Sequence, residues 1–303
     1  MVCFSGGKDS TVLAHLVHDI YPDVPLVFAN TGLEYPEIQS FARKMGAEFV
    51  RPRMRFDEVI SQYGYPLISK EVSLAICTGR KLKQNKEWRD MPNSKRNELL
   101  GYRTFIENKN GEMCERKSHY NKTKWMPLCN ETQFRISDRC CYVIKKTPIK
   151  KYQKETKRKP MLGTLADESK LRTIAWLKNG CNAYDSKNGT SQPLSFWREQ
   201  DILQFIWEEA IEIASVYGEV VSTDKNGFGY EPIPGIECNL KCTGCQRTGC
   251  MFCGFGAHLE KEPNRFQRMK KDYPKIWAYC LKPWDKGGLG MKEVLDFIGV
   301  KYE

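Results

Sequence analysis

Near its amino terminus the chain reads Val2-Cys3-Phe4-Ser5-Gly6-Gly7-Lys8-Asp9-Ser10. Three apolar residues precede the glycines, and apolar residues then recur at positions 12, 13, 16, 17 and 20, which is helical spacing. The pattern predicts a short strand, a glycine turn and a helix. Glycines let a backbone approach a ligand closely, and the amino end of a helix favours phosphate.

The polar residues of this loop indicate a phosphate-binding site. Ser5 and Ser10 supply hydroxyl groups, and Lys8 supplies a positive charge. The negatively charged Asp9 fits an anion-binding site only if it holds Mg²⁺ or orients the lysine. The Walker pattern is excluded, because it needs glycine where Val2 stands and Ser or Thr where Asp9 stands. The alternative is an ordinary glycine turn with a serine helix cap.

Strands and helices alternate after the loop. Val24 to Ala29 and Ala47 to Val50 have the pattern of buried strands, while residues 36–45 and 56–63 have helical patterns. Such alternation predicts an α/β fold with a right-handed, doubly wound parallel sheet. In such sheets a ligand binds at the carboxyl ends of the strands, where the glycine loop lies.

We expect two domains. The first covers residues 1–230 and contains a basic insertion at about 65–135, which could form a lid or a binding arm. The second is a Cys-rich carboxyl-terminal segment, residues 231–303, after a Gly/Pro-rich boundary. Helical patterns return at about residues 168–178, 196–213 and 291–298.

Composition indicates a cytoplasmic protein without a membrane span. No run approaches 18 apolar residues, and the start lacks a signal-peptide pattern. Thirteen cysteines in a long chain of this kind point to metal or cluster ligation rather than disulfides. Only three apolar residues precede the loop, fewer than a central strand usually has, so we expect the natural start to lie upstream.

The net charge of +11 is concentrated in two stretches. Residues 80–124 hold 13 Lys or Arg against 6 Asp or Glu, and residues 145–159 hold 8 against 1. This concentration indicates an anionic partner larger than one nucleotide, such as tRNA or DNA. The alternative is a solvated basic surface.

The loop resembles the PP-loop of the ATP-pyrophosphatase superfamily. In addition, Asn30-Thr31-Gly32-Leu33-Glu34-Tyr35-Pro36-Glu37 resembles the second-strand motif of its PAPS (phosphoadenosine phosphosulfate) reductase-like branch. The resemblance implies a fold of the adenine nucleotide alpha-hydrolase-like, HUP type. It also implies an adenine nucleotide bound by Ser5 to Ser10 and by Asn30, Thr31 and Gly32.

A second phosphate element begins at Gly163. Glu168, Ser169 and Arg172 follow at helical spacing. The guanidinium group of the arginine can donate two parallel hydrogen bonds to phosphate or sulfate oxygens. The stretch resembles the family's Gly-x-Arg-x-x-Glu-Ser-x-x-Arg element, except that Leu165 replaces the first arginine. Without this resemblance, the same residues would indicate only the first turn of a helix with an internal Glu–Arg ion pair.

Two cysteine elements resemble those of the assimilatory APS reductases. They are Cys140-Cys141 and Cys250-x2-Cys253. In that family these four thiolates hold a [4Fe–4S] cluster, and four soft thiolates suit a cluster or a tetrahedral metal site. The neighbouring Lys145, Lys146 and Arg247 would offset its negative charge.

Other cysteines leave alternatives open. A zinc site could use a local set, namely Cys242, Cys245, Cys250 and Cys253. The spacing Cys238-x3-Cys242-x2-Cys245 also matches radical-SAM enzymes, but those place it after the first strand of a barrel. Here it lies 58 residues before the carboxyl end.

The motifs favour an ATP-cleaving enzyme over a reductase. Reductases of this family end in a Cys-Gly-Leu/Ile-His nucleophile motif, which this chain lacks, and Cys280 has no neighbouring His. The complete loop indicates ATP cleavage between the α and β phosphates, with Mg²⁺, and with Lys8, Asp9 and Arg172 as catalytic residues. The acceptor could be sulfate, tRNA or DNA in sulfur metabolism or sulfur modification. The alternatives are an APS/PAPS reductase and a non-catalytic nucleotide- or nucleic-acid-binding module.

Overall fold

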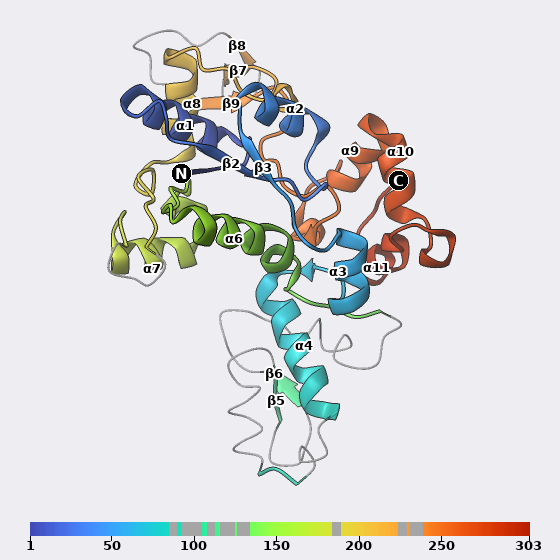
Figure 1. Cartoon of the computed structure of the whole chain (residues 1–303). Coiled ribbons are helices and arrows are strands. Elements are labelled where there is room, and N and C mark those ends of the chain that lie inside the picture. The colour runs from blue at the N-terminus through green and yellow to red at the C-terminus, as the bar shows by residue number, and fades with distance from the viewer. Residues whose placement is uncertain are drawn as a thin grey trace. The chain divides into compact units, whose positions relative to one another are not determined.

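The structure is a computed structural model of the chain (Figure 1). It describes residues 1–84, 90–92, 105–107, 113–115, 125, 134–183, 189–223, 229–230 and 239–303.

The chain folds into two compact units, and each unit is built from two separate stretches. The first unit contains Met1–Arg53 and Ile144–Cys250, and the second contains Met54–Val143 and Met251–Glu303. The domain boundary that the sequence predicts at residue 230 lies beside residues outside the described ranges, and it stays a prediction.

A parallel sheet forms the centre of the first unit. Strands β1 (Val2–Phe4), β2 (Leu26–Ala29) and β3 (Glu48–Val50) pair in the order β1-β2-β3. On the other side of β1, Val2 pairs in parallel with Met161, and Met161 pairs in parallel with Ser191. The chain therefore adds to the sheet on both sides of β1. This confirms the predicted doubly wound fold, whose strand order reverses at β1.

Helices cover this sheet, and one of them, residues 147–156, was not predicted from the sequence patterns. Helix α1 packs on β1 and on α8, while α6 packs on β2 and β3. The helices of this unit are α1 (Lys8–Ile20), α2 (Pro36–Lys44), α6 (Thr147–Thr156), α7 (Lys170–Asn179) and α8 (Glu199–Glu208), with the short helices η4 (Ala166–Glu168) and η5 (Ser215–Tyr217). The π-helix η3 (Tyr142–Lys146) leads directly into α6.

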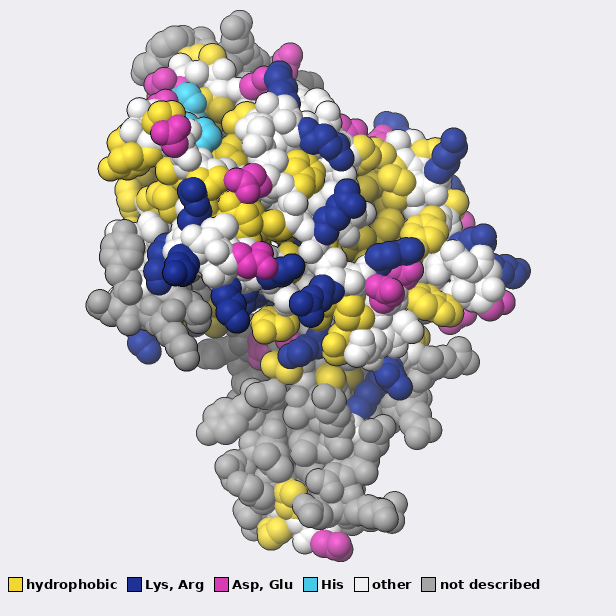
Figure 2. All heavy atoms as spheres, in the orientation of Figure 1, with side chains coloured by type: hydrophobic (Ala, Val, Ile, Leu, Met, Phe, Trp, Pro, Cys, Tyr) yellow, Lys and Arg dark blue, Asp and Glu magenta, His cyan; other side chains and the backbone are white. Residues whose placement is uncertain are grey.

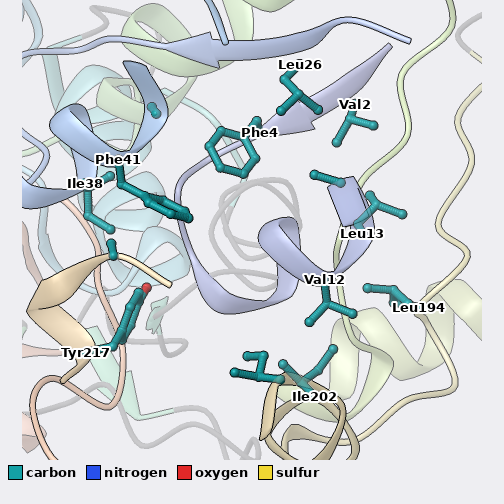
Figure 3. Close-up of a cluster of buried hydrophobic side chains, with 14 of the residues drawn as sticks. Val2, Phe4, Val12, Leu13, Leu26, Ile38, Phe41, Leu194, Ile202 and Tyr217 are labelled. Carbon is teal, nitrogen blue, oxygen red and sulfur yellow. The ribbon is translucent and has the colours of Figure 1, made fainter. Parts of the chain in front are cut away.

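The core of the first unit lies between β1, α1, α2 and α8 (Figure 3). Its residues are apolar and buried, and they include Val2, Phe4, Val12, Leu13, Leu26, Ile38, Phe41, Leu194, Ile202 and Tyr217. Burying a large apolar side chain contributes roughly 1.5–3 kcal/mol, so this cluster holds the start of α1 firmly against the sheet. A second sheet of this unit pairs β8 (Gly229–Tyr230), β7 (Val220–Thr223) and β9 (Asn239–Cys242), all antiparallel.

The second unit is largely helical. Strand β4 (Leu67–Ile68) pairs in parallel with β10 (Gly254–Phe255), and β5 (Phe105–Glu107) pairs with β6 (Met113–Glu115). The helices are α3 (Phe56–Tyr63), α4 (Lys70–Gln84), α9 (Arg265–Asp272), α10 (Pro274–Leu281) and α11 (Met291–Ile298), with η6 (Ala257–Leu259) and η7 (Trp284–Lys286).

The predicted insertion has its two ends side by side. Tyr65 forms a parallel bridge with Ile136, and its N–H donates to the Arg135 carbonyl at 2.8 Å. Residues 67–84, inside this stretch, form β4 and α4, which the sequence patterns did not predict. Much of the remaining insertion, including most of the basic residues 80–124, lies outside the described residues. Among the helices that the structure describes, none is long and apolar enough to cross a membrane.

Gly6 allows a test of how closely the glycine loop packs. Its φ is +69°, and a Cβ there would lie 2.8 Å from the Ile38 Cγ2 atom. Gly46 has a similar φ of +68° but has no atom within 4 Å of such a Cβ. We expect Gly46→Ala to lower the free energy of unfolding by about 1 kcal/mol, from backbone strain alone. Gly6→Ala should lower it by a further ~1 to 3 kcal/mol, because it also overpacks the core.

Urea denaturation of the two variants measures the difference. Equal losses for Gly6→Ala and Gly46→Ala would contradict a tightly packed loop.

Candidate functional site

The glycine loop is held by its own serines. The Ser5 N–H donates to the Ser10 Oγ at 3.1 Å, and the Ser10 hydroxyl donates to the Gly7 carbonyl at 2.9 Å. The Gly7 N–H donates to the Ser5 Oγ at 3.3 Å. These bonds fix the turn between β1 and α1, and they explain why serines flank the glycines.

A cavity of about 320 Å³ opens at this turn. Three of the segments in its walls follow parallel strands: the loop after β1, Glu34 after β2, and residues 163–165 after the bridge at Met161. A cavity at the carboxyl ends of strands, beside the point where the strand order reverses, is where doubly wound folds bind ligands. Its volume lies at the lower end of the range for small-molecule sites.

Gly163 brings the second predicted element against the loop. A Cβ on this glycine would lie 2.8 Å from the Asp9 carbonyl oxygen, so a larger residue would push the two segments apart. After Gly163 the chain enters η4, and Ser169 then caps α7 by accepting the Arg172 N–H. The predicted helix start is therefore present, and it places Glu168 and Arg172 in the cavity wall.

Lys8 is buried in the cavity wall, with 5% of its surface exposed. Its Nζ atom donates to the Glu199 Oε1 atom at 3.1 Å, and it lies 5.7 Å from the centre of the Tyr217 ring. Glu199 begins α8, so this ion pair joins two helices that are far apart in sequence. Burial raises the pKa of the Tyr217 hydroxyl to about 12, although its hydrogen bond with the Thr248 Oγ1 atom, at 2.5 Å, acts in the opposite direction.

Arg247 links two ion pairs across the cavity. Arg172 pairs with Glu168, and Arg247 lies 3.9 Å from the Glu168 Oε1 atom. Its other terminal nitrogen lies 4.0 Å from the Glu199 Oε2 atom. Three cations and two carboxylates thus form one connected network. In the same cavity wall the Lys145 Nζ atom lies 3.7 Å from the Glu34 Oε1 atom.

Asp9 lies among these charges. Burial is the largest influence on its carboxyl group and raises its pKa above the ordinary value. Lys8 lowers the pKa, Glu199 raises it, and Arg247 and Arg172 lower it. Burial thus disfavours the ionised form of Asp9. A metal cation that enters with the ligand would stabilise this ionised form, so the position suits a metal-binding carboxylate.

The structure brings most of the predicted nucleotide residues together. The cavity-lining ones are Ser5, Gly7, Lys8, Asp9, Glu168 and Arg172. Gly6, Ser10 and Ser169 shape the backbone behind them. Asn30, Thr31 and Gly32 do not line this cavity. Instead the Thr31 Oγ1 atom donates to Glu34 at 2.7 Å, and the Gly32 N–H donates to the Asn30 Oδ1 atom at 3.1 Å.

Sequence reasoning missed several lining residues, and four of them are polar. They are Glu199, Tyr217, Gln246 and Thr248. Arg247 was expected beside a metal cluster, and it lines this cavity. Glu199 lies in the first turn of a helix and Arg247 lies between two cysteines. Charged residues are common at such positions, so the sequence alone does not show that these two line the cavity.

The cysteines predicted to bind a metal fall in both units. Cys140, Cys141 and Cys253 belong to the second unit, and Cys250 is the last residue of the first. Cys140 is buried and the other three are half-buried. Within the described ranges no three His, Cys, Asp or Glu side chains gather as a metal site. The cluster and the zinc alternative therefore stay predictions.

The first unit is thus a doubly wound α/β fold with a charged cavity beside its glycine loop. A family model described as the phosphoadenosine phosphosulfate reductase domain matches residues 1–136 and 74–254. The chain belongs to this family, within the PP-loop superfamily. It is also similar to the crystal structure of a phosphoadenylyl-sulfate (PAPS) reductase from Candida auris in a phosphate complex. The identity is 12%, the TM-score is 0.36, and the match covers 71% of this chain and 75% of that one. A search of curated proteins finds no match.

Asp9→Asn tests the charge environment of the cavity through the pH dependence of stability. Because the folded state raises the pKa of Asp9, the ionised carboxylate is unfavourable at about pH 7 in the folded protein. We expect Asp9→Asn to be more stable than the parent there. The advantage should shrink as the pH falls through the raised pKa toward the ordinary value of about 4, because Asp9 then becomes neutral.

Thermal unfolding across a pH series gives the measurement, and Asp23→Asn, at an exposed position, is the control. A difference between Asp9→Asn and the parent that does not vary with pH would show that burial does not control this carboxyl group.

Proposed function

We propose that the protein binds ATP in this cavity and cleaves it between the α and β phosphates, transferring the adenylyl group and releasing pyrophosphate. The observation that carries this proposal is the position of the buried Lys8 ammonium. It lies in the first turn of α1, beside a glycine loop and at the carboxyl end of a central strand. Helix amino ends and lysines at such positions suit phosphate groups.

The loop is expected to hold the departing pyrophosphate. Lys8 and Arg172 would neutralise charge on it, and Arg247 would supply the cation that Leu165 does not. Leu165 has an apolar side chain with neither charge nor hydrogen-bond donor, so it cannot replace an arginine in binding an anion. Before the nucleotide binds, these cations are paired with Glu168 and Glu199. Phosphate oxygens would take the place of those carboxylates.

In the reaction an acceptor oxygen attacks the α-phosphorus. The bond from the α-phosphorus to the bridging oxygen breaks, and its electron pair leaves with pyrophosphate. The proton of the acceptor passes to solvent or to a nearby base. In this mechanism the protein acts chiefly by positioning the groups and stabilising charge.

Mg²⁺ is the expected companion of the nucleotide. The cavity wall carries as many carboxylates as cations, with Asp9, Glu34, Glu168 and Glu199 against Lys8, Lys145, Arg172 and Arg247. A strongly anionic triphosphate would meet little net positive charge there. Asp9 is the residue that we expect to hold the metal, which when bound supplies charge neutralisation at the phosphates.

Reduction of a sulfonucleotide is the second candidate, since it is the activity in the family's description. It needs a thiol nucleophile, and in the first unit the Cys242 thiol lies near the Lys8 ammonium. However, Cys242 is 1% exposed, and burial raises its pKa. The reactive form is the thiolate, so this environment makes Cys242 a poor nucleophile.

We retain the [4Fe–4S] cluster of Cys140, Cys141, Cys250 and Cys253 as part of the proposal, with zinc as the alternative. The donor set of four thiols fits either group. We also propose a cytoplasmic location, where reducing conditions keep thiols available for metal ligation.

Pyrophosphate release from ATP tests the main proposal, measured alone and with tRNA, DNA or sulfate as acceptor. We expect release in the presence of the right acceptor, and a loss of about a hundredfold or more in Lys8→Ala, because a charge-stabilising group is removed. Lys44→Ala is a matched control, since Lys44 forms an exposed ion pair with Glu212 and does not line the cavity.

Sulfite formation from APS or PAPS with a thiol donor, without pyrophosphate release from ATP, would overturn the proposal in favour of the reductase. Equal activity of Lys8→Ala and Lys44→Ala would also contradict it.

Elemental analysis of anaerobically purified protein separates cluster from zinc. We expect about four iron and four acid-labile sulfide per chain, falling sharply in Cys140→Ser, because four thiolates hold such a cluster. One zinc per chain that is retained in Cys140→Ser and lost in Cys245→Ser would support the local zinc set instead.

A further inference from the structure

Helix α6 and the residues around it carry an unusually dense positive surface. We define the α6 basic face as its exposed Lys and Arg residues: Lys146, Lys150, Lys151, Lys154, Lys157, Arg158 and Lys159. The same stretch has one acidic residue, Glu155, which lies 3.7 Å from Lys151. Figure 2 shows dark-blue Lys and Arg side chains gathered over the region where Figure 1 draws α6.

The α6 basic face runs directly from the cavity. Lys145, which lines the cavity, immediately precedes Lys146. At the other end, the Lys159 carbonyl accepts a hydrogen bond from the amino-terminal ammonium of Met1 at 3.0 Å. Met1 precedes β1, whereas the cavity lies at the carboxyl end of β1. The basic face therefore extends from the carboxyl end of β1 to its amino end.

Its charges repeat along one side of the helix. Lys146, Lys150 and Lys154 follow one another at intervals of four residues, so their side chains are neighbours on the helix surface. Like charges at this spacing destabilise a helix. An anion with regularly spaced charges would stabilise such a row of lysines. The phosphates of a sugar-phosphate backbone are spaced in this way.

The apolar residues of α6 argue against a membrane as the partner. Pro148 is buried, Ile149 and Tyr152 are half-buried, and the helix packs on β2 and β3. Tyr152 also donates a hydrogen bond to Glu48 of β3 at 2.8 Å. Helices that lie on membranes turn apolar residues outward to the lipid, and α6 turns its apolar residues to the sheet.

The size of the cavity favours RNA over duplex DNA. A cavity of about 320 Å³ has room for one nucleotide, which is ATP in the reaction proposed above, so the acceptor atom of a nucleic acid has to reach the mouth of the cavity. In duplex DNA a base reaches such a site only after unstacking and flipping, whereas single-stranded loops of a folded RNA already present unstacked bases.

We propose that the α6 basic face binds the phosphate backbone of a folded RNA and guides a single-stranded segment of it to the cavity. The proposal identifies RNA as the class of acceptor in the reaction proposed above, and this identification rests on that reaction. The binding itself requires no turnover.

Fluorescence anisotropy with labelled unfractionated tRNA tests the proposal on the full chain. The variant combines Lys150→Gln, Lys154→Gln and Lys157→Gln, none of which lines the cavity. We expect its affinity for tRNA to fall by about tenfold to a hundredfold, and the slope of log affinity against log salt to fall by about two. ATP binding should be unchanged.

The matched control combines Lys271→Gln, Lys275→Gln and Lys292→Gln, three exposed lysines of the second unit that cause the same change in net charge. Unchanged tRNA affinity in the control supports the proposal, and an equal loss in both variants overturns it. Tighter binding to duplex DNA, or to vesicles of anionic lipid, than to tRNA also overturns it. Selective loss of tRNA binding in a protein that releases no pyrophosphate from ATP would leave the RNA surface standing and refute only the reaction.

Discussion

The buried ammonium group of Lys8 is the constraint on which the cavity depends. An ionised group removed from water is strongly unfavourable unless an opposite charge or a hydrogen-bond acceptor replaces the water. Glu199 fills that role from a helix 191 residues further along the chain. Because Glu199 also lies close to Arg247, and Arg247 close to Glu168, the pairing extends to Arg172 and connects the loop to the start of α7.

This network also defines what a ligand must do. A phosphate group that reaches Lys8 has to replace the Glu199 carboxylate, and it must offer Arg172 and Arg247 a comparable partner. Charged oxygens at several points of one ligand meet that requirement, as in a polyphosphate. The buried Asp9 adds a negative charge nearby, which favours a ligand accompanied by a divalent cation.

Much of the first unit could be predicted because its signals are local. The glycines and helical periodicity predict β1 and the presence of α1, and the apolar runs and periodicity place β2, α2 and β3 within two residues of their observed ends. The pair formed by Glu168 and Arg172 also follows from residues four apart on one helix. By contrast, Glu199 and Tyr217 reach the cavity only through packing between distant segments, and no local pattern marks such contacts. Strand β4 is two residues long and depends on pairing with β10, so periodicity could not reveal it.

The family match agrees with the resemblance carried by the loop, but it does not decide between ATP and a sulfonucleotide as substrate. The two ligands differ in the group attached to the 5′-phosphate of the adenosine, which is pyrophosphate in one and a sulfonyl group in the other. Calorimetric titration of the native chain with ATP and with AMP, in the presence of Mg²⁺, tests most directly whether the cavity recognises that pyrophosphate. We expect ATP to bind about tenfold or more tightly than AMP, because charge-assisted hydrogen bonds to the β and γ phosphates are gained. Equal affinity for ATP and AMP would contradict a pyrophosphate-binding cavity.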